Sequence, residues 1–434
     1  MTRHKTCDGI VRRDCLKAGV LGAGALTLSS YLRLANAGEI GNAKADRAIF
    51  IELPGGPSHL DTFDLKPEAP DSIRSKFKAI ETNVPGIRIS EHLPNLAKCA
   101  DKYAILRGVS HTLAAHELGR EYVNTGSRPL PSLDYPAYGS AIAMQMPTDE
   151  DIPTNVAVPK VGQGPGFLGI RYAALETNST PRYGQPYSVR GLSASGTITA
   201  DEIRRRQGLL SKLDKRFASV ESDRQLLDGL DRFGSQAYSM ITSPRARTAF
   251  DISKEPASFA GQFGEDPFGL SCLLALRLVE SGVRYVTVQL GGWDTHQDNF
   301  TKLSSELLPK LDIGLSALLN GLEQRGLLQS TAVLATGEFG RTPKINDRTA
   351  DGGRDHYPRC MFMLMAGGGV RGGQVIGESD DTASAPRHEA ITPDDVAASF
   401  YHNLGIDPAM EFHTETGRPI TLVRDGKIIQ SLFG

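Results

Sequence analysis

The feature that most constrains the fold is a repeated unit in which a short apolar segment is followed by a glycine loop carrying acids or histidines. The apolar segments are short enough, and rich enough in β-branched residues, to predict buried strands bounded by turn residues. In open parallel sheets, ligand sites form at the carboxyl ends of the strands. The unit therefore predicts an α/β fold with polar groups gathered at one sheet edge. The predicted strands span residues 48–53, 283–290, 331–336 and 360–365.

Helical patterns separate these strands. The segment from Phe268 to Ser281 predicts a helix closed by Gly282, and further helices are predicted over 303–319 and 392–404. Residues 200–260 repeat leucine and other apolar residues at helical spacing among charged residues, which predicts a helical insert packed as a cap on the main sheet. The charges of this insert are interpreted as a solvated face.

The amino terminus has the layout of an export signal. Arg12 and Arg13 precede a mildly apolar stretch, and Ala35 and Ala37 stand at the spacing that a signal peptidase requires. We therefore predict that residues 1–37 form a twin-arginine signal peptide and that 38–434 form a single mature α/β domain. This predicts the twin-arginine export machinery as a partner and a periplasmic or secreted location. An ordinary secretory signal or an uncleaved anchor is the alternative interpretation. No other stretch of the sequence is predicted to cross a bilayer.

Charge and cysteine content narrow the function classes. The chain has 48 basic and 50 acidic residues; six basic and two acidic ones fall in 1–37, which leaves 42 and 48 and a net charge of −6. This balance, without any basic run interleaved with aromatic residues, argues against a nucleic-acid partner. Three scattered cysteines remain in 38–434, and they form no disulfide framework.

Two of the loops carry metal-ligand chemistry. Asp294, His296 and Asp298 lie within five residues of one another after two glycines, and aspartate with histidine suits Zn²⁺ or another divalent ion. A turn with hydrogen-bonding aspartates is the alternative. His59 and Asp61 follow the first predicted strand, where they either serve the site or, for Asp61, cap the next turn.

A predicted helix carries a candidate anion site. His116 and Arg120 are four residues apart, so on a helix running to Thr125-Gly126 they share a face. A histidine and a guanidinium near a helix start can hold an anionic group. The alternative is that each is an ordinary surface residue.

The motifs occur in an order that resembles a known family. The chain is similar to the exported family filed as domain of unknown function 1501, and more broadly to the alkaline phosphatase and sulfatase superfamily. The resemblance implies a three-layer sandwich around a mostly parallel central sheet, interrupted by the helical insert. The motifs that carry it are Gly55-Gly56-Pro57-Ser58-His59-Leu60-Asp61-Thr62-Phe63-Asp64, Gly292-Trp293-Asp294-Thr295-His296, Gly337-Glu338-Phe339-Gly340-Arg341-Thr342-Pro343 and Gly353-Arg354-Asp355-His356-Tyr357-Pro358.

The resemblance to the superfamily also implies metal ligands. Asp294 is similar to the aspartate of the first metal site, and either His296 or Asp298 stands where its nearby histidine is expected. His356 resembles the last histidine of that site, and Asp61 resembles the first acid of a second site. Divalent ions are therefore expected, with Zn²⁺ in one site and Zn²⁺, Mg²⁺, Mn²⁺ or Ca²⁺ in the other.

Two positions depart from the superfamily pattern. Glu338-Phe339-Gly340 replaces Asp-His-Gly, which keeps the carboxylate of Glu338 as a candidate metal ligand and loses an imidazole. His116 occupies the place of the sulfatase nucleophile, nine residues before Thr125, while Arg120 keeps the place of the arginine. Three explanations remain open: His116 forms a phosphohistidine, His116 is a metal ligand beside an attacking water, or the site binds without catalysis.

Together, the motifs and the resemblance imply an exported, metal-dependent hydrolase of phosphate or sulfate esters that uses metal-activated water. Its expected substrate is an anionic ester, either a small molecule or a carbohydrate. The alternative is a non-catalytic metal-binding, surface or carbohydrate-binding protein that has retained the fold.

Overall fold

The protein is represented by a computed structural model that describes residues 43–149, 151–189, 243–413, 417 and 419–434. The predicted signal peptide, 1–37, lies outside the described residues. So does most of the predicted insert, of which 243–260 are described and contain two short helices, α8 (Pro244–Phe250) and α9 (Ala257–Ala260). The division into signal, domain and insert stays a prediction.

The described residues form one large sheet of eight strands, in which only β11 runs against its neighbours. All other pairings in this sheet are parallel. In spatial order the strands are β12 (Gln374–Ile376), β4 (Tyr103–Val109), β11 (Met361–Ala366), β8 (Thr331–Thr336), β1 (Arg47–Glu52), β7 (Tyr285–Gln289), β5 (Asn155–Val158) and β6 (Leu175–Glu176).

Three strand pairs lie outside the large sheet. They are β2 (Ala79–Glu81) with β3 (Arg88–Ser90), β9 (Gly340–Arg341) with β10 (His356–Tyr357), and β13 (Glu411–His413) with β14 (Pro419–Thr421). The remaining α-helices are α3 (Pro94–Ala97), α4 (His116–Thr125), α5 (Tyr138–Gln145), α10 (Pro267–Glu280), α11 (Asn299–Lys302), α12 (Leu308–Gln324) and α13 (Pro393–Asn403).

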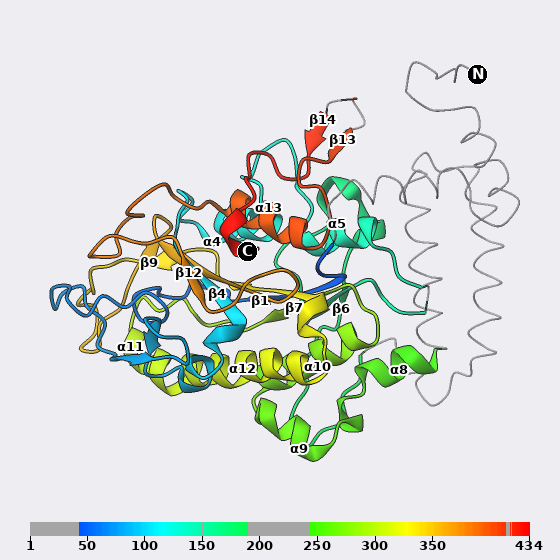
Figure 1. Ribbon diagram of the computed structural model, residues 1–434, viewed down its shortest axis with the longest axis horizontal. Helices are drawn as coiled ribbons and strands as arrows, with labels where there is room; N and C mark the ends of the chain where they lie inside the picture. The colour runs from blue at the N-terminus through cyan, green and yellow to red at the C-terminus, as the bar shows by residue number, and fades with distance from the viewer. Residues whose placement is uncertain (1–42, 150, 190–242, 414–416, 418) are drawn as a thin grey trace, which may run out of the picture.

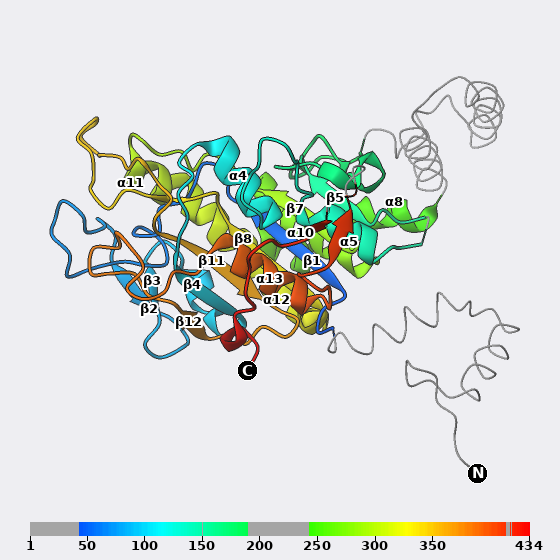
Figure 2. The ribbon, with the colours of Figure 1, turned by 90° about the horizontal axis from the view of Figure 1, so that it is seen from above.

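Helices cover both faces of the sheet, so the predicted three-layer α/β sandwich with a mostly parallel sheet is confirmed. Figure 1 shows α10 and α12 below the strands and α13, α5 and α4 above them. Figure 2, seen from above, shows α13 and α5 lying across the strands. A sheet covered on both faces needs strands that are apolar throughout, and β8 and β11 are buried along their whole length.

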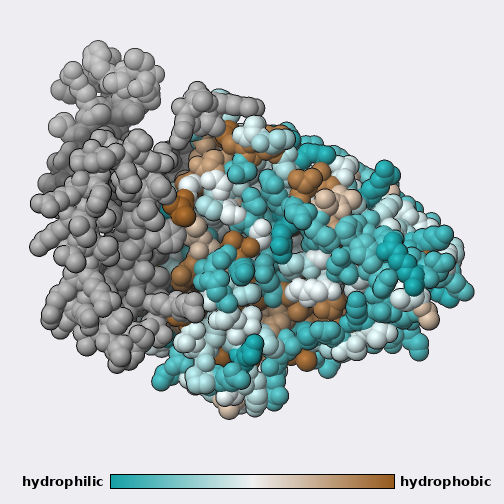
Figure 3. Space-filling model, turned by 180° about the vertical axis from the view of Figure 1, so that it is seen from behind, coloured by the Kyte–Doolittle hydropathy of each residue, from teal (hydrophilic) through white to brown (hydrophobic). Residues whose placement is uncertain are grey.

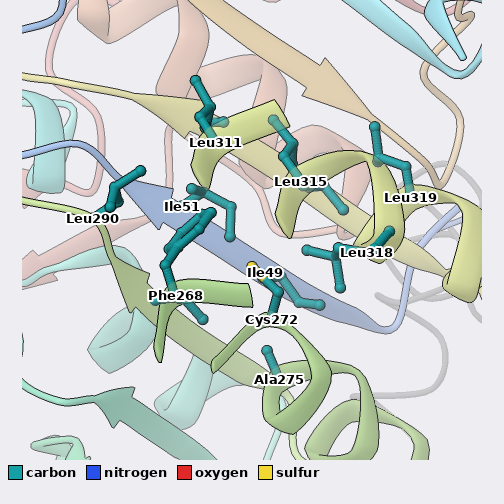
Figure 4. Packing of buried hydrophobic residues seen from close by; sticks show 14 of the residues in the cluster. Ile49, Ile51, Phe268, Cys272, Ala275, Leu290, Leu311, Leu315, Leu318 and Leu319 are labelled. Atoms are coloured by element: carbon teal, nitrogen blue, oxygen red, sulfur yellow. The ribbon is translucent and has the colours of Figure 1, made fainter. Parts of the chain in front are cut away.

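Alternate side chains of each strand enter two separate cores. Ile49 and Ile51 of β1 point toward α10 and α12, where they meet Phe268, Cys272 and Leu315, as Figure 4 shows. Ala48 and Phe50 belong to the opposite core, together with residues of α4, α5 and α13. This alternation follows from the two-residue period of a strand. It holds the strands rigidly and so fixes the loops at their ends.

Most elements form where the sequence predicts them. Helix α4 ends where expected, because Gly126 adopts a left-handed backbone with φ 67° and its amide closes on Tyr122. The predicted helix over 303–319 is instead a π-helical turn (Leu303–Leu307) followed by α12, which continues to Gln324. No pattern in the sequence indicates that β11 is antiparallel or that β4 lies next to it.

Among the described residues, no helix is long and apolar enough to span a membrane. Figure 3 shows one face of the molecule, on which polar residues predominate and apolar ones gather in small groups. Cys99, Cys272 and Cys360 are all buried and unpaired, so none of them forms a disulfide.

Candidate metal centre at the carboxyl edge of the sheet

The sheet topology brings four distant chain segments together at one edge. The loops after β1, β7 and β8 leave from this edge, because these strands are parallel neighbours. Helix α4 follows β4, which points the same way. The antiparallel β11 begins at this edge, so His356, just before it, joins His116, Asp294 and Glu338. Because β11 is antiparallel to its neighbours, His356, which precedes β11 in the chain, lies at the carboxyl edge of the other strands.

Three imidazole rings surround the carboxylate of Asp294. The Nε2 atoms of His296 and His356 each lie 3.1 Å from Oδ1 of Asp294, and the Nε2 of His116 lies 3.4 Å from Oδ2. The two atoms His296 Nε2 and His356 Nε2 are 3.0 Å apart. Among the described residues, His116, Asp294 and His356 form a group whose ligand atoms all lie within 4.8 Å of one another.

The other nitrogen of each ring is held by an acceptor. His116 Nδ1 donates to Oε1 of Glu338 at 2.5 Å, and His296 Nδ1 donates to Asp355 at 2.5 Å. His356 Nδ1 donates to the carbonyl of Ala114 at 2.8 Å. A carbonyl and an ionised carboxylate can only accept, so in the neutral rings the hydrogen sits on Nδ1 and every Nε2 presents a lone pair.

This arrangement fits a divalent metal ion. Zinc bonds histidine nitrogen at about 2.0–2.1 Å, so two ligands on a tetrahedral ion lie about 3.3 Å apart. The four spacings around Asp294 run from 3.0 to 3.4 Å. Lone pairs facing each other at such distances repel unless a proton or a metal cation lies between them. A carboxylate or carbonyl behind each ligating histidine is also the usual outer shell of a metal site.

Asp294 is kept ionised by its neighbours. Partial burial by itself raises the pKa of Asp294, but the hydrogen bond and charge of Arg341 outweigh burial and lower that pKa to about 2. Arg341 Nη2 donates to Asp294 Oδ1 at 2.7 Å and is completely buried. Its Nε donates to the carbonyl of Gly56, which fixes the guanidinium between the loops after β1 and β7.

The centre is partly open to solvent. The side chain of Asp294 is 45% exposed and that of His116 is 35% exposed, while Glu338 behind it is 4% exposed. The ring of Phe339 packs on His116 and His356, with ring centroids 5.1 and 4.5 Å apart. The site can thus exchange a ligand on one side while an aromatic floor and a buried carboxylate hold the histidines on the other.

Asp61 lies in a separate, completely buried cluster. Its two oxygens accept from Arg354, at 2.8 and 3.2 Å, and Oδ2 also accepts from Ser58 and Asn299. Burial would raise the pKa of Asp61, but the charge of Arg354 and these hydrogen bonds lower it. Asp61 is fully engaged as the partner of a buried guanidinium, and the structure does not bring it to the cluster around Asp294.

Three other predicted residues lie outside the group formed by His116, Asp294 and His356. His59 is completely buried, and its Nε2 lies 2.9 Å from the carbonyl of Ala383. Asp298 adopts a left-handed backbone at the start of α11, with φ 54°. Arg120 lies one turn after His116 on α4, and its Nε donates to the buried carboxylate of Glu52 at 2.8 Å.

Three residues of the centre were not singled out from the sequence. Arg341 and Asp355 both stand inside motifs that carried the family resemblance, but their partners come from other loops. Arg348 lies 2.9 Å from Asp355 and faces solvent. The role of Arg341 could have been suspected from the sequence, because an arginine beside an acid-rich loop often pairs with one of its acids. The contact of Asp355 with His296 could not, because it depends on how the loop between β9 and β10 folds back.

Comparisons with known proteins give a family and weak structural likenesses. A family profile described as "Protein of unknown function (DUF1501)" matches residues 45–433, which confirms the resemblance to that family. No curated protein is significantly similar to the chain.

Several solved structures resemble the chain at low similarity. A lipoteichoic acid synthase from Listeria monocytogenes is 11% identical with a TM-score of 0.39, over 90% of this chain and 80% of that one. A sulfatase from Pseudoalteromonas sp. is 12% identical with a TM-score of 0.38, over 92% and 74%. A member of the alkaline phosphatase superfamily from Vibrio parahaemolyticus is 8% identical with a TM-score of 0.36, over 85% and 68%. At these scores the likeness carries no functional conclusion for this chain.

Proposed function

This chain belongs to the DUF1501 family of proteins of unknown function, and we propose that it is a metal-dependent hydrolase of phosphate or sulfate esters. The observation that carries the proposal is the group of His116, Asp294 and His356, whose ligand atoms all lie within 4.8 Å of one another, with the Nε2 of His296 beside it at 3.1 Å from Asp294. A catalytic zinc site typically has three protein ligands and one open position. The cluster has four such side chains, His116, Asp294, His296 and His356. If three of them bind the ion, its fourth position is available to water or substrate.

The charge of the centre supports an anionic substrate only when a metal is bound. Asp294, Glu338 and Asp355 contribute three negative charges, and Arg341 and Arg348 contribute two positive ones. Without a metal ion the cluster would therefore be negative by one charge and would repel a phosphate or sulfate. One divalent ion reverses the sign to plus one, so metal binding and anion binding are expected to be coupled.

Each protein group then has a distinct task. Glu338, Asp355 and the carbonyl of Ala114 hold the Nδ1 hydrogens and so aim the three imidazoles, while Arg341 keeps Asp294 ionised. A bound divalent ion would lower the pKa of water and polarise the ester. We assign His116 as a ligand, because its Nε2 faces the carboxylate of Asp294 at 3.4 Å.

Arg120 and the export route belong to the same proposal. The Nε of Arg120 is committed to Glu52, so only its terminal nitrogens would be available to an ester oxygen. The twin-arginine signal over 1–37, a periplasmic or secreted location, and an ester carried on a small molecule or a carbohydrate remain predictions. A second ion near Asp61 has less support, because both oxygens of that carboxylate are engaged.

The second candidate function is a metal-binding protein without catalysis. It is favoured by Thr295, the hydroxyl residue next to Asp294, because this hydroxyl is buried and donates to Asn299 at 2.6 Å. It is also favoured by Phe339, which stands where active members of the superfamily are expected to have a histidine. In this case the same ligands would bind the ion, and ester hydrolysis would be missing.

Metal analysis followed by an ester assay tests the proposal. The purified mature protein is expected to contain about one equivalent of a divalent metal and to hydrolyse an aryl phosphate or an aryl sulfate, with activity lost in chelator and restored by Zn²⁺ or Mn²⁺. His356→Ala should lose both metal and activity. His388→Ala, at an exposed histidine, is the matched control and should lose neither.

The outcomes distinguish the hydrolase from the non-catalytic metal-binding protein, or exclude both. A folded protein that binds no divalent metal overturns both. Metal binding that depends on His356, without hydrolysis of either ester, supports the non-catalytic alternative. If His116→Ala hydrolyses esters as fast as the parent, His116 is neither the nucleophile nor a required ligand.

A further inference from the structure

A cavity of about 340 Å³ lies on the α5 side of the sheet, apart from the metal centre. It is bounded by Tyr285 and Thr287 of β7, by Asn155 of β5, and by the loop that carries Gly162 and Gly164. This volume is at the lower end of the range typical of small-molecule pockets. Every residue that lines it belongs to the described part of the chain, and none is a candidate metal ligand.

Asn155 is an unsatisfied polar side chain in the wall of this cavity. It is 5% exposed, and its Oδ1 has no hydrogen-bond partner among the described residues. Gly139 makes room for it, since a Cβ at that position would lie 2.5 Å from Asn155 Oδ1. Buried carboxamides are normally hydrogen-bonded. The Oδ1 of Asn155 lies against Gly139 with almost no accessible surface, so a ligand in the cavity meets this oxygen only if the carboxamide turns and Oδ1 and Nδ2 exchange places.

The cavity differs from the metal centre in its charge. Among the described lining residues, Glu176 is the only carboxylate, and there is no lysine, arginine or histidine. The other polar groups are carboxamides and hydroxyls, as in Asn124, Asn155 and Thr287, beside apolar groups such as Leu175. Carboxamides both donate and accept, which matches hydroxyl groups, and the apolar wall matches C–H surface. An anion would find no positive partner here.

The cavity and the centre are neighbours along α4. Asn124 lines the cavity and His116 faces Asp294, so eight residues of helix, about 12 Å, separate the two. Between them the buried carboxylate of Glu52 binds Arg120 and Asn124. Gly162, in the cavity wall, lies so close that a Cβ there would be 2.2 Å from Glu52. The charged pair Glu52–Arg120 thus lies beside the stretch of α4 that runs from the centre to the cavity.

We propose that this cavity is a second binding site, which takes a neutral polyhydroxylated molecule of monosaccharide size. The ligand's hydroxyls would satisfy Asn155 and its neighbours, and its ring would lie against the apolar wall. The site does not require the metal centre, so a failure of the proposed hydrolase function leaves this proposal intact.

Two variants close the cavity in different ways. A side chain at Gly164 would enter open space, because nothing lies within 4 Å of a Cβ there and its backbone is not left-handed, so Gly164→Val adds apolar bulk to the cavity lining without strain. Asn155→Leu keeps the branched shape and removes both polar atoms. Gly261→Val is the matched control, since Gly261 is equally unhindered and lies outside this cavity.

The test measures binding of glucose, galactose, fucose and N-acetylglucosamine to the mature protein by saturation-transfer NMR and calorimetry. At least one sugar is expected to bind, equally well with and without chelator. Binding should weaken at least tenfold in Gly164→Val and Asn155→Leu and stay unchanged in Gly261→Val. Unfolding midpoints for all variants show whether they remain folded.

Three results would overturn the proposal. The first is that none of the four sugars binds the parent protein. The second is that a sugar binds with the same affinity to folded Gly164→Val and Asn155→Leu. The third is that inorganic sulfate displaces the sugar in the presence of chelator, because that would place the sugar in an anion site.

Discussion

Two charged clusters lie near the same edge of the sheet, and each contains an aspartate paired with an arginine. The two pairs differ in burial and in the other groups that surround the carboxylate. In the buried cluster, Asp61 and Arg354 are both completely inaccessible, and the carboxylate oxygens are engaged by hydrogen-bond donors. In the centre around Asp294, the carboxylate is 45% exposed and meets one arginine and three imidazole lone pairs. The first arrangement is complete without a ligand, and the second could hold a metal ion.

The difference shows what makes an acid at a strand end a candidate ligand. Residue type and position in the motif are similar for Asp61 and Asp294. What distinguishes them is whether the surrounding groups donate hydrogens or present lone pairs. Donors stabilise a carboxylate as a structural partner, whereas lone pairs from imidazoles leave a deficit of positive charge that a metal ion can fill.

The largest expected effect is at the buried cluster. Arg354→Leu leaves Asp61 charged and unpaired in the interior, which should lower the free energy of unfolding by about 3–5 kcal/mol. The measurement is denaturant unfolding in the presence of chelator, so that metal makes no contribution. The double variant Asp61→Asn, Arg354→Leu should recover part of this loss. A loss below about 1 kcal/mol for Arg354→Leu would mean that the two clusters do not differ as described.

The next effect is the response to metal, which should come only from the centre around Asp294. A ligand at 100 times its Kd stabilises the folded state by about 2.7 kcal/mol. Zn²⁺ added to chelator-treated protein is therefore expected to raise the free energy of unfolding by about that amount. The rise should vanish in His356→Ala and persist in His388→Ala. An equal rise in His356→Ala would show that the metal binds elsewhere.

Most of the fold follows from local patterns in the sequence. The strands β1 and β8 and the helices α4 and α10 form where apolar periodicity, glycine stops and turn residues predict them, because these signals act over a few residues. The direction of β11 could not be predicted in this way. It depends on a strand inserted between β4 and β8, and apolar composition is the same for a parallel and an antiparallel buried strand.

The sequence predicts which residue types form the site. It does not predict which of the candidates surround Asp294 and which make other contacts. Asp294, His296 and His356 belong to motifs that suggest ligands, and they do come together. His59 and Asp61 carry the same chemistry at another strand end, yet their contacts are with Ala383 and Arg354. Which histidine nitrogen is free depends on an acceptor contributed by a distant loop, and sequence spacing holds no information on that.

A smaller effect is expected where an acceptor behind a ligand is changed. Glu338→Gln keeps an oxygen for the amide of Gly55 but no longer fixes the hydrogen of His116 on Nδ1. Such changes typically weaken metal binding by about 10–100-fold. Competition with a chelating dye measures the affinity. Glu306→Gln, at an exposed acid of α12's preceding turn, is the control and should bind metal as the parent does.

The smallest effect is expected at the exposed counterpart of the Asp61–Arg354 pair. Arg348 and Asp355 are 2.9 Å apart, like Arg354 and Asp61, but their side chains are 47% and 36% exposed. Solvent-exposed ion pairs contribute about 0–1 kcal/mol, so Arg348→Gln should change the free energy of unfolding by less than about 1 kcal/mol. Denaturant unfolding of Arg348→Gln and Arg354→Leu under the same conditions compares the two changes in the free energy of unfolding directly.

The result for Arg348 also tests the charge argument for the metal centre. Removing this guanidinium makes the cluster more negative, so metal affinity should stay the same or rise slightly while the affinity for an inorganic phosphate or sulfate inhibitor falls. Titration of the metal-loaded variant with each anion measures the second effect. If anion affinity is unchanged and metal affinity drops, Arg348 acts by positioning Asp355 behind His296, and the positive charge that receives the anion comes from elsewhere.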